Sequence, residues 1–119
     1  MASSATVSVP KEFVALVESI ADDFDRRWRD ANTKGRAGVA AVLRRQWDEF
    51  RSFVHKLADI VSGRVHPAEY LTRIGTTPDD VVVYKFAVGK WHVGFVEDPD
   101  SDAWTLVYDE AFWSSVTKR

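Results

Sequence analysis

The sequence predicts an α+β fold, with an N-terminal short strand and an antiparallel helical hairpin packed on one face of a C-terminal antiparallel β-meander. Two observations predict this class. Apolar residues recur every three or four positions from Pro10 to Val61, which is typical of amphipathic helices, and they alternate in steps of two from Val81 onward, which is typical of strands. A chain of 119 residues has the length of one domain. We therefore expect residues 1–119 to form a single α+β domain.

Composition and charge narrow the classes of function. Hydrophobic residues make up 45% of the chain and charged residues 29%, which favours a folded protein over disorder. The chain has no cysteine, no apolar run near the roughly 18 residues that a membrane span needs, and no secretory pattern in its first residues. We expect a cytoplasmic protein that does not associate with a membrane. The net charge of −2 argues against broad, sequence-independent binding of nucleic acid.

The N-terminal half is predicted to form a short strand and two helices. Residues 5–9, ATVSV, favour a strand, and Pro10 suits the first turn of a helix. That helix should run to about Asp30, and a second helix should stop at Ser62-Gly63. The apolar stripes that we expect to enter the core are Phe13, Val17, Ile20, Phe24 and Trp28 in the first helix, and Val39, Leu43, Trp47, Phe50, Val54, Leu57 and Val61 in the second.

Two further features lie in or after this half. Basic residues gather at Arg26, Arg27, Arg29, Lys34, Arg36, Arg44 and Arg45. Aspartates are interleaved with them, which is typical of a solvated helix face, and the sequence assigns this cluster no other role. The segment HPAEYLTRI suits one or two helical turns that direct Tyr70, Leu71 and Ile74 toward the core. Residues 75–80 are predicted to be a loop.

The meander begins with a hairpin whose register the sequence predicts. In YKFAVGKWHVGFVED, residues 84–98, the alternation breaks at Gly89-Lys90, and a glycine at the first position of a two-residue loop is typical of a type II′ turn. The facing pairs on the wholly apolar side are then Val88 with Trp91, Phe86 with Val93, and Tyr84 with Phe95. We expect that side to pack on the helices. The acidic loop DPDSD and a third strand, AWTLVYDE, follow.

The opposite side of the hairpin carries a lysine and a histidine. In this register Lys85 pairs with Gly94 and His92 pairs with Ala87, which makes the two polar side chains diagonal neighbours. Polar residues are ordinary on the wet side of an antiparallel sheet. A chemical interpretation is that a cation and an imidazole can hold phosphate and move a proton, as RNA cleavage through the 2′-hydroxyl requires. His92 would then act as acid or base, and Lys85 would stabilise the developing charge.

Two segments resemble the RelE/ParE toxin superfamily, whose members place a strand and a helical hairpin before such a meander. ATVSVPKEFVALVESI looks like the family's opening strand running into a helix through a "peF" segment, here Pro10 to Phe13. VVVYKFAVGKWHVGFVED looks like its central hairpin: Val88-Gly89 match the turn and Trp91 matches the aromatic. His92 stands in place of the usual arginine, and the protein is acidic where ribosome-targeted toxins are usually basic.

The resemblance implies a toxin of a toxin–antitoxin system. In the ribonuclease members, a basic cluster and often a tyrosine or histidine near the chain end act on ribosome-bound messenger RNA. Carried over by position, it implies a metal-independent endoribonuclease with His92 and Lys85 as catalytic residues, and with Lys118 and Arg119 as substrate-binding residues. An antitoxin protein would be the partner, and messenger RNA or the ribosome the target.

The remaining sequence features indicate neither a metal site nor a cofactor. They also allow a second class of function. No histidine pair has the spacing of a helical metal site, and no nucleotide-binding motif occurs. The aromatic residues Trp104, Phe112 and Trp113 suit either the core or a surface on which bases stack, so Trp113 is a further candidate for substrate binding. The alternative function is a non-catalytic interaction protein, such as an immunity, regulatory or phage-encoded binding module. Its contact surface would be the acidic loop 97–102 and the aromatic end of the chain.

Overall fold

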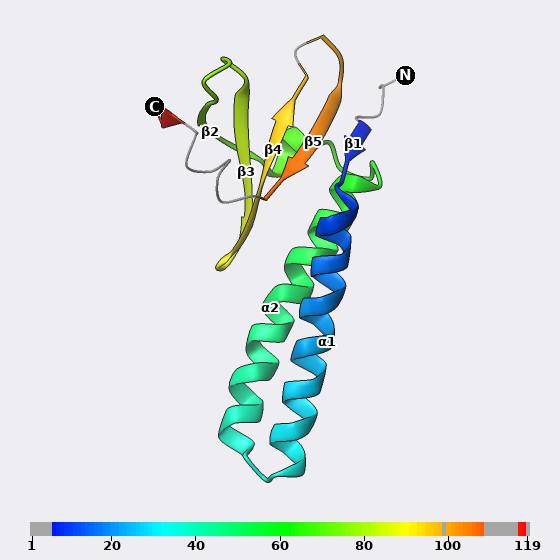
Figure 1. Ribbon diagram of the computed structural model, residues 1–119, viewed down its shortest axis with the longest axis vertical. Helices are drawn as coiled ribbons and strands as arrows, with labels where there is room; N and C mark the ends of the chain where they lie inside the picture. The colour runs from blue at the N-terminus through cyan, green and yellow to red at the C-terminus, as the bar shows by residue number, and fades with distance from the viewer. Residues whose placement is uncertain (1–5, 99, 109–116, 119) are drawn as a thin grey trace.

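The computed structural model describes residues 6–98, 100–108 and 117–118. The elements, in chain order, are β1 (Thr6–Ser8), α1 (Lys11–Thr33), α2 (Ala37–Val61), α3 (Pro67–Tyr70), β2 (Thr72–Thr76), β3 (Val82–Val88), β4 (Trp91–Glu97), β5 (Ala103–Val107) and β6 (Thr117–Lys118) (Figure 1). The strands form one sheet in the order β1-β5-β4-β3-β2-β6. β1 is parallel to β5, and the other neighbours are antiparallel. The predicted α+β class is confirmed.

Glycines end both long helices with the same hydrogen-bond pattern. After α1, the N–H of Arg36 donates to the carbonyl of Ala31 at 2.8 Å, and the N–H of Gly35 donates to Asn32 at 3.1 Å. After α2, Arg64 and Gly63 repeat the pattern on the last turn of that helix. This is the Schellman motif, which needs a left-handed residue. Gly35 and Gly63 provide it, at φ +69° and +83°.

The core lies between one end of the helical hairpin and the sheet. Its buried members are Phe13 of α1, Phe53, Leu57 and Ile60 of α2, Phe86 of β3, Val93 and Phe95 of β4, and Trp104 and Leu106 of β5. The predicted apolar side of the β3–β4 hairpin therefore packs on the helices. Trp104 is only 2% exposed, so it belongs to the core and is not a surface for stacking bases.

The far part of the helical hairpin extends beyond the sheet. The connection between α1 and α2 lies at the opposite end of the molecule from the strands (Figure 1). The molecule measures 55 × 35 × 23 Å. The predicted stripe of α2 is wrong at Val39, which is 50% exposed in the extension, and at Val61, which is 38% exposed at the last residue of the helix. Trp47 is half-buried and lies outside the core. Phe53 and Ile60, which the stripe omitted, are buried instead.

The segment after α3 differs from the prediction. α3 ends at Tyr70, and β2 begins at Thr72, where we expected further helix and then a loop from Gly75. The pairing of β2 with β3 shifts register between Arg73 and Gly75. This irregularity removes the period-two alternation by which a strand is recognised in a sequence.

Within the described ranges, no helix combines the length and the apolar character that crossing a membrane requires.

Candidate functional site

The β3–β4 hairpin has the register that the sequence predicts. Val88 pairs with Trp91, Ala87 with His92, and Lys85 with Gly94. Gly89 has φ +59°, whereas Lys90 does not have a positive φ, which agrees with a type II′ turn. The register places His92 and Lys85 on the side of the sheet that faces away from the helices.

His92 is exposed and Lys85 is half-buried on that side. As diagonal neighbours on adjacent strands, they lie roughly 7–8 Å apart at the backbone, a distance that one phosphate group between the two side chains could bridge. Nδ1 of His92 lies 3.4 Å from the carbonyl oxygen of Lys90. A carbonyl oxygen can only accept, so Nδ1 of His92 is the donor in this contact.

The rest of this sheet face is more buried than we expected. Val83, which lies on the same side of β3 as Lys85, is 0% exposed, and Gly94 beside Lys85 is also buried. The accessible part of the face therefore centres on His92 and Ala87, which pair with each other and are both exposed. The catalytic proposal depends on this smaller surface.

The structure describes only one of the three predicted substrate-binding residues. Trp113 and Arg119 lie outside the described residues. Lys118 belongs to β6, where it pairs with Gly75 of β2. Because β2 and β3 stand between β6 and β4, three strand spacings, roughly 14 Å, separate Lys118 from the strand that carries His92. The structure therefore brings His92 and Lys85 together but does not place Lys118 next to them.

Of the other two histidines, His66 has a local structural role. His66 caps α3, because its Nδ1 accepts the N–H of Ala68 at 3.1 Å, and its Nε2 lies 3.3 Å from the carboxylate of Asp102. Asp102 also accepts the indole N–H of Trp104 at 3.2 Å. The acidic loop is thus tied to α3 and the core through Asp102. His55 is exposed on α2.

The basic residues of the helices are largely paired, as a solvated helix face predicts. Ion pairs at helical spacing join Arg27 to Asp23 at 3.1 Å, Arg29 to Asp25 at 3.1 Å, Lys34 to Asp30 at 3.3 Å and Arg44 to Asp48 at 3.3 Å. No group of three or more metal-ligating side chains occurs in the described part of the chain.

A cleft on the helix side of the hairpin was not predicted. It lies between α1, α2 and the β3–β4 turn, and its volume is about 700 Å³. Arg27, Gln46 and Lys90 line it together with Trp91. Sequence reasoning missed this set because the residues come from three elements with no common spacing. Only the position of Lys90 in the tight turn could have suggested that the turn contacts α2, where Glu49 accepts the backbone N–H of Lys90.

No family model matches the chain, and no curated protein or solved structure matches it either.

Proposed function

We propose that this protein is a toxin-like member of a toxin–antitoxin system that cleaves messenger RNA without a metal ion, using the sheet face away from the helices. The observation that carries the proposal is the β3–β4 register, which sets the exposed His92 diagonally across from Lys85. The order of the elements, with a strand and a helical hairpin before an antiparallel meander, supports the resemblance to RelE/ParE toxins.

The chemistry that this pair can supply fits cleavage through the 2′-hydroxyl. An imidazole can accept the hydroxyl proton as the oxygen attacks the phosphorus, or give a proton to the departing 5′ oxygen. The lysine cation can stabilise the extra negative charge on the phosphate oxygens in the transition state. Neither role needs a metal ion.

Growth after induction tests this proposal. We expect the wild-type chain to arrest the growth of a bacterial host, and His92→Ala or Lys85→Ala to restore growth. His55→Ala is the matched control, because it removes an exposed imidazole from α2, and it should still arrest growth. Purified wild-type protein should cleave messenger RNA in excess EDTA, and His92→Ala should lose this activity while its unfolding free energy changes by less than about 1 kcal/mol.

A second candidate function, a non-catalytic interaction protein, is favoured by an apolar groove between the two long helices. Val14 and Val17 of α1 face Val54 and Val61 of α2 across it, and Val14 is 47% exposed. Exposed apolar patches of this kind often bind a protein partner. Normal growth at high expression of the wild-type chain, with no RNA cleavage, would contradict the toxin and support this function.

A further inference from the structure

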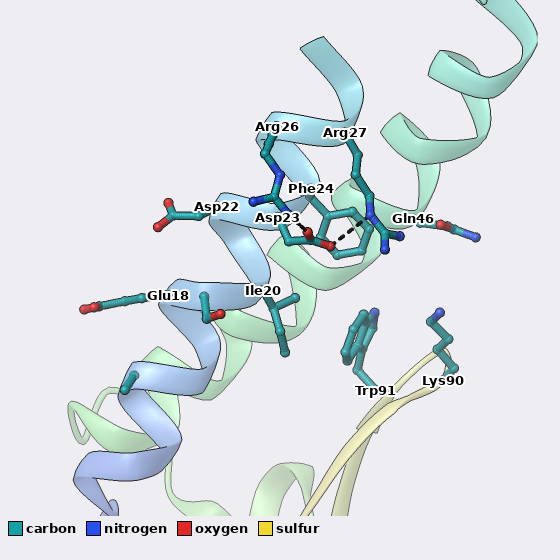
Figure 2. Close-up of a pocket in the computed structure, with 12 residues that line it drawn as sticks. Glu18, Ile20, Asp22, Asp23, Phe24, Arg26, Arg27, Gln46, Lys90 and Trp91 are labelled. Carbon is teal, nitrogen blue, oxygen red and sulfur yellow. Dashed lines mark hydrogen bonds and ion pairs between the residues drawn. The ribbon is translucent and has the colours of Figure 1, made fainter. Parts of the chain in front are cut away.

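The cleft between the helices and the β3–β4 turn gathers hydrogen-bond donors at one end. Arg27 of α1 and Lys90 of the turn point toward each other across the opening, and the indole nitrogen of Trp91 points into the same region (Figure 2). The carboxylates of Glu18 and Asp22, which also line the cleft, point away from this end. Asp23 also lines the cleft, and its carboxylate forms ion pairs with Arg26 and Arg27 at this end. The donor end therefore holds Arg26, Arg27 and Lys90 against one carboxylate and keeps a positive charge.

The two cations retain donors for a ligand. Arg27 pairs with Asp23 through Nε at 3.1 Å, and no other part of the described chain occupies its terminal nitrogens. The ammonium of Lys90 lies 5.2 Å from the centre of the Trp91 ring, and it has no carboxylate partner among the described residues. A cation held only over an aromatic face can move to a nearby anion at little cost, because that contact is worth about 1 kcal/mol.

Trp91 supplies a donor that lacks an acceptor. Its Nε1 is buried and forms no hydrogen bond with any described residue. The ring is fixed against Phe50, at 4.8 Å between centroids, and against Phe24, at 6.2 Å. A buried N–H without an acceptor costs about 1–3 kcal/mol. If Lys90 moves off the ring and a ligand oxygen enters, that oxygen can accept the indole N–H, and this free energy is recovered.

We propose that this cleft binds a small phosphate monoester, whose phosphate lies between Arg27, Lys90 and the indole N–H of Trp91. Arg26, Arg27 and Lys90 against the one carboxylate of Asp23 leave two positive charges, which match the charge of a monoester dianion, and Arg is well suited to phosphate oxygens. Ile20 and Phe24 provide an apolar wall beside the donor end, against which the organic part of the ligand lies. A volume of about 700 Å³ is within the range of small-molecule sites. This site is separate from the sheet face and does not depend on the proposed RNA cleavage.

The test follows the indole N–H resonance of Trp91 in the full chain by NMR, with Trp91→Phe identifying the signal. We expect 5′-AMP to shift this resonance in a saturable manner, inorganic phosphate to shift it more weakly, and adenosine to leave it unchanged. Arg27→Gln and Lys90→Gln should each weaken AMP binding by about tenfold or more. Arg29→Gln is the matched control, because Arg29 pairs with Asp25 outside the cleft, and it should bind as the wild type does.

Several results would overturn the proposal. These are no shift of the Trp91 resonance at AMP concentrations up to about 10 mM, equal shifts with adenosine and AMP, no shift with inorganic phosphate, or an equal loss of affinity in Arg29→Gln. The NMR spectrum of each variant also reports whether it is folded, so a misfolded variant is recognised and replaced by Lys90→Met or Arg27→Lys.

Discussion

At the scale of single residues, Gly89 sets the geometry on which the sheet face and the cleft both depend. Its φ is +59°, in the region that L-residues rarely adopt. A β-carbon there would also collide with the carboxylate of Glu49, which accepts the N–H of Lys90 at 3.3 Å. Glu49 can therefore hold the turn with its carboxylate in this position only because residue 89 has no side chain.

Replacing this glycine should be costly. Gly89→Ala is expected to lower the unfolding free energy by about 1–2 kcal/mol, because the left-handed backbone disfavours alanine and Glu49 must release the turn. Urea denaturation measures the change. Gly38→Ala is the control, because an added β-carbon in this turn of α2 meets nothing within 4 Å; it should be neutral or stabilising by up to about 1 kcal/mol. A Gly89→Ala variant as stable as the wild type would contradict the turn geometry.

Residues in one hairpin could be placed from the sequence, and residues in different elements could not. The alternation on both sides of Gly89-Lys90 was sufficient to predict that His92 and Lys85 share a face, because neighbouring strands joined by a two-residue turn have only one register that keeps the apolar side buried. The approach of Arg27 to Lys90 depends instead on how α1 lies against the turn. That arrangement follows from tertiary packing, and no short-range pattern encodes it.

At the scale of elements, the helices are longer than the sheet that they cover. α1 has 23 residues and α2 has 25, or roughly 35 Å each at 1.5 Å per residue. The strands β3 and β4 have 7 residues each, or roughly 23 Å. An apolar stripe shows which face of a helix is buried, but it does not show how far along the helix the partner element reaches. This is why the sequence placed Trp47 and Val39 in the core.

Two aromatic truncations should distinguish the part of the helical hairpin that packs on the sheet from the part that extends beyond it. Phe86→Ala is expected to lower the unfolding free energy by about 3 kcal/mol or more, because Phe86 is buried against Phe53 at 5.4 Å between ring centroids. Trp47→Ala should cost about 1 kcal/mol, because Trp47 is half-buried and contacts mainly Trp28 and exposed arginines.

Chemical denaturation of the two variants at matched concentration gives both values. Equal losses would mean that the extension is packed as tightly as the core, against the arrangement described above. The same measurement on Phe53→Ala provides a helix-side control, since Phe53 is 3% exposed and lies opposite Phe86.

At the scale of the whole molecule, stability should vary along the helical hairpin. The helix ends next to β1 pack on the sheet through Phe13, Leu57 and Ile60. Among the described residues, the extension packs chiefly through contacts of one helix with the other, at the small buried residues Ala31 and Ala40 and the Trp28–Trp47 pair. Two helices without a third element bury little apolar surface, so their far turns should open without global unfolding.

Native-state hydrogen exchange tests this gradient residue by residue. We expect amides of β4 and of residues 53–60 to exchange only through global unfolding, whereas amides of residues 26–33 and 38–46 should exchange through local opening at a free energy several kcal/mol lower. The helical hydrogen bonds are the same in both regions, so only the tertiary burial differs. The control is Phe86→Ala, which should lower the protection of the first set and leave that of the second nearly unchanged. Uniform protection along α2 would mean that the extension and the sheet unfold as one cooperative unit, and the cleft at their junction would then be a rigid site.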